Sequence, residues 1–206
     1  MSVKKQSKIS ALKIRRIIFH ICLGLTIMLL ALYNVSFARK ILLTAIIIGI
    51  FISLLSLRLK IPFIYFMLKK FESPRYIRKF PGKSALFFIA GCLLALKLFP
   101  NNMALASIGI LTFGDPFSHV LSYLSNKRYT KPRNVFKNIY GTIAGVFVSF
   151  AASSYFVYWL YALLASVIAM IAESFIITLG DEAIDDNFFI PLIAGTVIYI
   201  LTRINF

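Results

Sequence analysis

The chain has 206 residues, of which 60% are hydrophobic and 15% are charged, and its formal net charge is +16. Soluble globular domains are about 45–50% apolar, so this composition excludes an ordinary soluble protein and predicts an all-α, polytopic integral membrane protein. A membrane span takes ~20 residues. The length therefore leaves room for about seven transmembrane helices in one membrane-embedded domain, residues 1–206, without a separate soluble domain.

Seven apolar segments follow one another along the chain, and we predict a membrane-spanning helix in each. They are residues 17–37, 41–57, 84–99, 103–124, 139–159, 161–179 and 188–204. The first follows a basic start, as the core of a signal peptide does, but its apolar run is longer than the ~7–15 residues of such a core. We therefore interpret it as a retained span.

The basic residues indicate the orientation of these spans. Six Lys and Arg lie in the tail 1–16, eight in residues 58–83 and five in residues 123–138, and only four lie on the alternate connections. Because positive residues gather on the cytoplasmic side, we expect a cytoplasmic N-terminus and basic loops that contact anionic lipid headgroups. The acidic loop 180–187 falls on the same face. The cations do not form one continuous stripe, so nucleic acid is not expected as a partner.

Asp115 is the first candidate functional residue, because a carboxylate inside or beside the apolar segment 103–124 is expensive to keep. Pro116 favours the first turn of a helix and disfavours helical geometry in the residue before it. We therefore predict that one helix ends near Gly114 and that Asp115 caps the start of another. Such a break is tolerated where it lines a cavity.

The residues after Asp115 continue a polar face. Ser118, His119 and Ser122 lie three, four and seven positions further on, which places them on one side of the new helix. A single histidine in such a place is more often a hydrogen-bonded residue between helices than a metal ligand. For the whole face, the alternative is that Asp115 only caps a kinked helix.

Two charged segments could hold a nucleotide and its metal. The basic loop contains Lys127, Arg128, Lys131 and Lys137, whose side chains suit a triphosphate; the alternative is a loop that only touches anionic lipid. The segment from Asp181 to Asn187 has four carboxylates and an amide, which are oxygen ligands that suit Mg²⁺. Its alternative is an acidic turn that balances the basic loops.

The fifth and sixth apolar segments carry small residues at helical spacing. Gly141, Gly145 and Ser149 repeat every four residues, a pattern that lets membrane helices approach closely. In the sixth segment, Glu173 shares a face with small residues at positions 162, 166 and 169, so we expect its side chain to point into the bundle. The alternative to a functional role is a protonated, structural glutamate.

Taken together, these motifs resemble the CTP-dependent lipid-alcohol kinases, the family of dolichol kinase, phytol kinase and the CTP-using diacylglycerol kinase. The resemblance runs from about residue 15 to residue 200. Its motifs are Arg16 to His20, Ala104 to Pro116, Lys137 to Thr142, Glu173, and Ile184 to Asn187 with Pro191. The chain departs from the family pattern at Ser118, Ser122, Asn126 and Tyr140.

The resemblance implies transfer of the γ-phosphate of CTP to the hydroxyl of a polyprenol or dolichol, diacylglycerol or phytol at the cytoplasmic face. Asp115 and Asp186 are then expected to hold Mg²⁺, and Glu173 or Asp185 to receive the proton of the lipid hydroxyl. The residues expected to bind the nucleotide are Lys127, Arg128, Lys131, Lys137 and Asn187.

Two other functions fit the same residues. One is a cytidylyltransferase similar to the phosphatidate cytidylyltransferases, which would release pyrophosphate in place of CDP. The other is a non-catalytic membrane protein or small transporter. Transport requires acids reachable from both sides, whereas the acids here gather at the predicted cytoplasmic face.

Overall fold

The structure is a computed structural model that describes residues 11–58, 80–125, 139–174, 178–179, 182–183 and 185–204. Its helices are α1 (Ala11–Tyr33), α2 (Val35–Arg58), α5 (Lys83–Leu98), α6 (Asn101–Gly109), the π-helix η1 (Ile110–Gly114), α7 (Asp115–Ser125), α8 (Ile139–Ser153), α9 (Trp159–Ser174) and α10 (Asp186–Ile204). Two strands of two residues, β1 (Thr178–Leu179) and β2 (Glu182–Ala183), pair antiparallel. The predicted helical class is confirmed.

Among the described residues, four helical stretches are long and apolar enough to cross a membrane. They are Lys13–Tyr33, Val35–Arg58, Asn101–Leu124 and Asp186–Ile204. Helices α8 and α9 are apolar but shorter, about 23 Å at 1.5 Å per residue against ~30 Å of hydrocarbon. The described helices are therefore compatible with a helical membrane protein.

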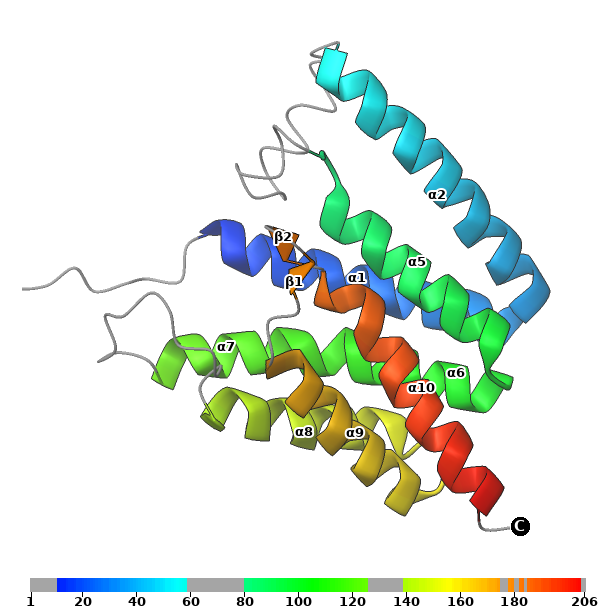
Figure 1. Cartoon of the computed structure of the whole chain (residues 1–206), viewed down its shortest axis with the longest axis vertical. Coiled ribbons are helices and arrows are strands. Elements are labelled where there is room, and N and C mark those ends of the chain that lie inside the picture. The colour runs from blue at the N-terminus through cyan, green and yellow to red at the C-terminus, as the bar shows by residue number, and fades with distance from the viewer. Residues whose placement is uncertain are drawn as a thin grey trace, which may run out of the picture.

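The continuous helix formed by α6, η1 and α7 occupies the centre of the bundle (Figure 1). Leu105, Ile108 and Leu111 are at most 1% exposed, because α1, α8 and α10 all pack against both α6 and η1. Helix α2 packs against α1 and α5 and leaves Ile47 and Phe51 exposed, as a lipid-facing helix does. Residues on the central helix are thus held by neighbours on several sides.

Helix α8 approaches α7 closely along the predicted stripe of small residues. Gly141, Gly145 and Ser149 are buried, and a Cβ atom on Gly141 would lie 1.9 Å from the Oγ atom of Ser122. A larger side chain at Gly141 would therefore push the two helices apart. The predicted packing role of this stripe is confirmed.

The boundary between the first two spans differs from the prediction. We expected a helix over residues 17–37, whereas α1 ends at Tyr33 and α2 begins at Val35. The side chain of Asn34 explains the interruption, because its Oδ1 atom accepts a hydrogen bond of 3.0 Å from the backbone N–H of Phe37 and so caps α2. Arg39 and Lys40 consequently belong to α2.

The fifth and sixth predicted segments also end differently. In residues 139–159, α8 ends at Ser153. Residues 161–179 do not form one helix, since α9 ends at Ser174 and Thr178 lies in β1. The β-branched run Ile176, Ile177 and Thr178 favours extended backbone over helix. The predicted acidic loop 180–187 therefore includes the strand β2 and the first two residues of α10.

The predicted basic loops are only partly visible in the structure. Residues 59–79 and 126–138 lie outside the described residues. Lys83, which we counted with the loop 58–83, is the first residue of α5 and is 9% exposed. Its Nζ atom lies 5.7 Å from the centroid of the Phe87 ring, so the ring accommodates this cation within the fold.

Candidate functional site

The central helix changes its winding immediately before Asp115. The prediction that a helix ends at Gly114 is wrong, because Asp115 is helical (φ −59°, ψ −49°) and the helix continues to Ser125. Pro116 has no N–H, and its ring crowds the carbonyl one turn earlier in an α-helix. The wider π-turn from Ile110 to Gly114 gives room for the ring without a break.

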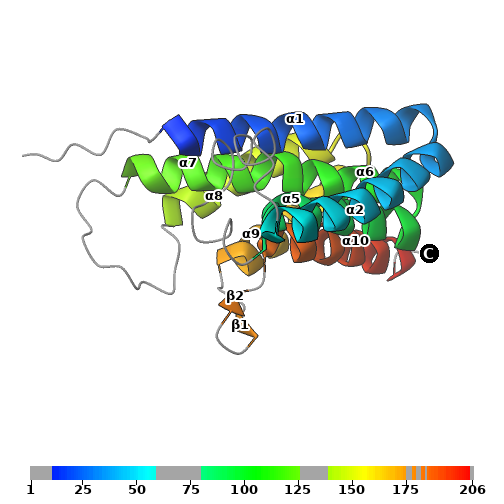
Figure 2. The same cartoon turned by 90° about the horizontal axis from the view of Figure 1, so that it is seen from above.

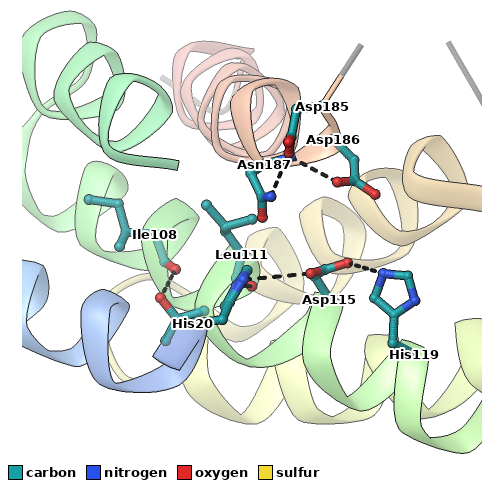
Figure 3. A network of polar contacts seen from close by, with 9 residues as sticks. His20, Ile108, Leu111, Asp115, His119, Asp185, Asp186 and Asn187 are labelled. Atoms are coloured by element: carbon teal, nitrogen blue, oxygen red, sulfur yellow. Dashed lines mark hydrogen bonds and ion pairs between the residues drawn. The ribbon is translucent and has the colours of Figure 1, made fainter. Parts of the chain in front are cut away.

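His20 on α1 binds the backbone that this π-turn exposes. A π-turn pairs each carbonyl with the N–H five residues further on, and for Leu111 that residue is Pro116, which has none. The Nε2 atom of His20 lies 3.1 Å from the Leu111 carbonyl oxygen and donates to it (Figure 3). His20 therefore joins α1 to the π-turn.

The other nitrogen of His20 faces Asp115. His20 Nδ1 lies 3.8 Å from the Oδ2 atom of Asp115, and the imidazole packs edge-on against Phe88 of α5 at a centroid distance of 4.6 Å. This places His20 beside the candidate carboxylate, although we had not predicted it as a site residue. The only signal in the sequence was its place in the Arg16–His20 motif.

Four potential metal ligands converge around Asp115. One ligand atom from each of Asp115, His119, Glu173 and Asp186 lies within 4.8 Å of all the others. The four residues come from α7, α9 and α10, which are far apart in the sequence. Asp115 and Glu173 are only 6% and 4% exposed. The structure thus brings together Asp115, Glu173 and Asp186, the three acids expected to act together, and adds His119.

His119 and Asp115 are in direct contact within this cluster. The Nε2 atom of His119 lies 3.1 Å from the Oδ1 atom of Asp115, one turn away on the same helix. The side chain of His119 is 49% exposed and Asp186 is half-buried, so the cluster is accessible at these two residues. Figure 3 shows the Asp186 carboxylate on the same side of the Asp115 carboxylate as His119.

Asp185 lies beside this cluster and is not one of its four members. Its Oδ1 atom accepts hydrogen bonds from the side-chain amide of Asn187 at 2.5 Å and from the backbone N–H of Asn187 at 3.3 Å. Burial raises the pKa of Asp185 to about 6, and the neighbouring Asp186 carboxylate acts in the same direction; hydrogen bonds from Asn187 and Ser84 oppose the shift.

Asn187 presents a buried oxygen at the same place. It is 8% exposed, and its Oδ1 atom has no hydrogen-bond partner among the described residues. Figure 3 shows the amide turned toward Leu111 and Asp115. A buried acceptor without a donor costs about 1–3 kcal/mol, and a cation would remove that cost.

The donor set fits a divalent cation. Three carboxylates within 4.8 Å of one another repel each other in a poorly solvated site. A divalent ion would neutralise most of that charge, and carboxylate and amide oxygens are its usual ligands. Asp115, Glu173, Asp186 and His119 are the residues that would hold it, with Asn187 near by.

Of the predicted nucleotide-binding residues, Asn187 is the one that the structure describes. Lys127, Arg128, Lys131 and Lys137 lie outside the described residues, as does Asn126. On α1, the described cations nearest to His20 in the sequence are Arg15 and Arg16. Neither was predicted to bind a nucleotide.

The register of α1 against α7 indicates where Arg16 lies. The two helices run side by side in both views (Figures 1 and 2). His20 faces Asp115, and the Nζ atom of Lys13 lies 4.4 Å from the ring centroid of Tyr123, so the helices are antiparallel. In an antiparallel pair, the residue one turn before His20 on α1 lies beside the residue one turn after Asp115 on α7. These two residues are Arg16 and His119. We therefore expect Arg16 next to His119.

The residues that depart from the family pattern have separate explanations. Ser118 is fully buried, and a Cβ atom on Gly145 would lie 3.1 Å from its Cβ atom. Ser122 similarly faces Gly141. Both serines therefore contribute to the contact between α7 and α8. Tyr140 is exposed at the beginning of α8.

Comparison with protein-family models, curated proteins and solved structures finds no match to this chain. The resemblance to the lipid-alcohol kinases therefore rests on the sequence motifs. The chemistry of the cluster around Asp115 is independent of that resemblance, because it follows from the positions of the side chains.

Proposed function

We propose that the chain is a metal-dependent phosphotransferase of the membrane, which transfers the γ-phosphate of CTP to the hydroxyl of a lipid alcohol. One observation carries the proposal: three acids from separate helices meet within 4.8 Å, together with His119, beside a buried π-turn. Ionisable groups in membrane helices are rare and functional when they occur. Phosphoryl transfer requires such a site, because its catalysis consists mostly of positioning and charge neutralisation.

The acids divide into metal ligands and a candidate base. Asp115 and Asp186 hold the cation, Mg²⁺ in the first instance, and Glu173 joins them because its carboxylate lies in the same ligand group. The bound cation supplies charge neutralisation on the phosphate oxygens. Asp185 lies outside the group and receives the proton of the lipid hydroxyl. Burial raises the pKa of Asp185 above its ordinary value, which makes its carboxylate a better proton acceptor.

The nucleotide phosphates also require cations from the protein. Arg16 has no ion-pair partner among the described residues and is half-buried on the face of α1 that carries His20. Its planar fork of N–H groups matches phosphate oxygens. In this proposal Arg16 binds the nucleotide phosphates, and the basic residues between positions 126 and 138 complete the binding site.

The surface of α7 supports a substrate that enters from the lipid. Phe117, Leu121 and Leu124 are exposed and form one stripe on the face away from Asp115. Leu124 is nine residues beyond Asp115, about 14 Å along the helix. If this stripe faces lipid, the carboxylate lies well below the membrane surface, within reach of a lipid hydroxyl.

The seven-span arrangement belongs to the same proposal. The four long apolar helices would cross the membrane together with α5, α8 and α9. The N-terminus and the basic loops would then face the cytoplasm, where CTP is found.

The direct test is to incubate the purified protein with Mg²⁺, labelled CTP or ATP, and a panel of diacylglycerol, polyprenol and phytol. The expected result is a labelled lipid and release of CDP. Release of pyrophosphate with a lipid phosphate as acceptor would indicate a cytidylyltransferase instead. A protein that binds neither a nucleotide nor a divalent cation would be a non-catalytic membrane protein.

A further inference from the structure

The imidazole of His119 distinguishes the cluster from a site made only of oxygen ligands. The geometry points to a mixed nitrogen–oxygen metal site that takes a first-row transition-metal ion in preference to Mg²⁺, with the Nε2 atom of His119 as the nitrogen ligand. This inference deepens the proposed function, because it concerns the cation of the same site and assigns a residue that neither the motifs nor the resemblance assigned.

The distances in the cluster suit a single ion. Two ligands on opposite sides of a metal with bonds of ~2.0–2.2 Å are about 4.0–4.4 Å apart. The ligand atoms of Asp115, His119, Glu173 and Asp186 lie within 4.8 Å of one another. Side-chain shifts of a few tenths of an ångström would therefore bring all four onto one ion.

The pair His119 and Asp115 has the separation of two adjacent ligands. Around an octahedral ion with bonds of ~2.1 Å, neighbouring ligand atoms are about 3.0 Å apart. The Nε2 atom of His119 and the Oδ1 atom of Asp115 are 3.1 Å apart. Their spacing of four residues on one helix turns both side chains to the same side, as metal-binding residues on helices often do.

A second observation points to a ligand independently of the acids. Asn187 is only 8% exposed, and its buried Oδ1 atom has no hydrogen-bond partner among the described residues. Its amide is turned toward Asp115 (Figure 3). A metal ion or its bound water would satisfy this oxygen.

The ligand types predict the preference. Imidazole favours first-row transition ions, whereas Mg²⁺ prefers oxygen ligands and retains its waters. Mn²⁺ is a suitable probe because it accepts both carboxylates and imidazole. The site would therefore bind Mn²⁺ more tightly than Mg²⁺, and the difference would depend on His119.

The experiment measures cation binding to the purified full chain without nucleotide. Mn²⁺ binding is followed by electron paramagnetic resonance, and Mg²⁺ by competition. The wild type is expected to bind Mn²⁺ at least about tenfold more tightly than Mg²⁺, and His119→Gln to lose most of that ratio, since metal sites respond to such losses by about 10–100-fold. His119→Asp, which restores a ligand oxygen, is expected to bind both ions with little preference.

The chain's other histidine provides the matched control. His20 donates its Nε2–H to Leu111, so His20→Gln is expected to leave the Mn²⁺ to Mg²⁺ ratio unchanged. Electron spin echo measurements add a direct readout: bound Mn²⁺ should show coupling to an imidazole nitrogen in the wild type and in His20→Gln, but not in His119→Gln.

Two results would overturn the inference: no nitrogen coupling in the wild type, or a wild-type ratio in His119→Gln. Neither result affects the kinase assay, which reports lipid phosphorylation with either ion. Conversely, a protein that shows the nitrogen coupling but labels no lipid would retain the metal site and lose the proposed function.

Discussion

The two ends of the bundle handle polar side chains in different ways. At the end where α1 stops and the C-terminus lies (Figure 1), Arg39 donates from Nε to the carbonyl oxygen of Leu96 at 2.9 Å, and Arg203 bonds the Tyr199 hydroxyl one turn away. Arg39 thereby satisfies a carbonyl in the last turn of α5. Tyr155, Tyr158 and Trp159 are exposed at this end, as at a membrane interface.

At the other end, side chains from α1, α7, α9 and α10 meet one another. His20, Asp115, Glu173 and Asp186 come from four helices, and Asp115 and Glu173 are buried. Keeping several acids together opposes folding, whereas capping a helix favours it. The contacts at the first end therefore favour stability, whereas the acids at the second end are placed as the proposed function requires.

The largest effect is expected for Asp115→Asn. This change keeps the size of the side chain and removes its charge, so the cation loses a central ligand. We expect the rate of lipid phosphorylation to fall by at least about a hundredfold, the loss typical for one strong electrostatic contact. The protein should still insert and elute as a folded particle in detergent. Near-normal turnover would remove Asp115 from the mechanism.

The next largest effect is expected for Arg16→Gln, compared with the same change at the neighbouring Arg15. Arg16→Gln should raise the KM for CTP about tenfold, because a charge-assisted hydrogen bond contributes about 1.5–3 kcal/mol. Arg15→Gln is the matched control: it removes the same charge from an exposed position, about 100° around α1 from Arg16, and should leave KM nearly unchanged. Equal changes in both variants would mean that only the overall positive charge matters.

A change at the opposite end should alter stability without altering catalysis. Arg39→Gln removes the hydrogen bonds to Leu96 and should lower the free energy of unfolding by about 1–3 kcal/mol. Thermal unfolding in detergent measures the loss, and kcat per folded molecule should stay at the wild-type value. A fall in kcat with unchanged stability would contradict the division between the two ends.

The smallest effect concerns Asp185 in the metal-free protein. Its pKa is about 6 in the folded state and 3.8 as an ordinary value, so the folded protein takes up this proton first as the pH falls. Because the folded state binds this proton more tightly than the unfolded state, protonation of Asp185 stabilises the fold. This stabilisation is present below pH 4 and is lost as the pH rises from about 4 to 6. When the pH is lowered from 7 to 5, the unfolding temperature of the wild type should therefore rise by more than that of Asp185→Asn. Parallel curves for the two proteins would contradict the raised pKa.

The helical class and most of the helices could be predicted from the sequence, because the hydrophobicity of a segment is a local property. The stripe of Gly141, Gly145 and Ser149 and the inward position of Glu173 followed from helical spacing for the same reason. The limits of α1 and α9 were missed. The Asn34 cap and the β-branched residues before Thr178 act within a few residues and were masked by the apolar pattern.

The π-turn, the place of His20 and the role of His119 depended on tertiary packing. Pro116 predicts a disturbance of the helix, but whether the chain breaks or widens depends on the neighbours that hold it in line. His20 meets Leu111 only because α1 packs against the π-turn in one register, and His119 joins the cluster only because α9 and α10 bring Glu173 and Asp186 to it. Local residue patterns determine which segments become helices, whereas contacts between distant segments decide which of their polar groups meet.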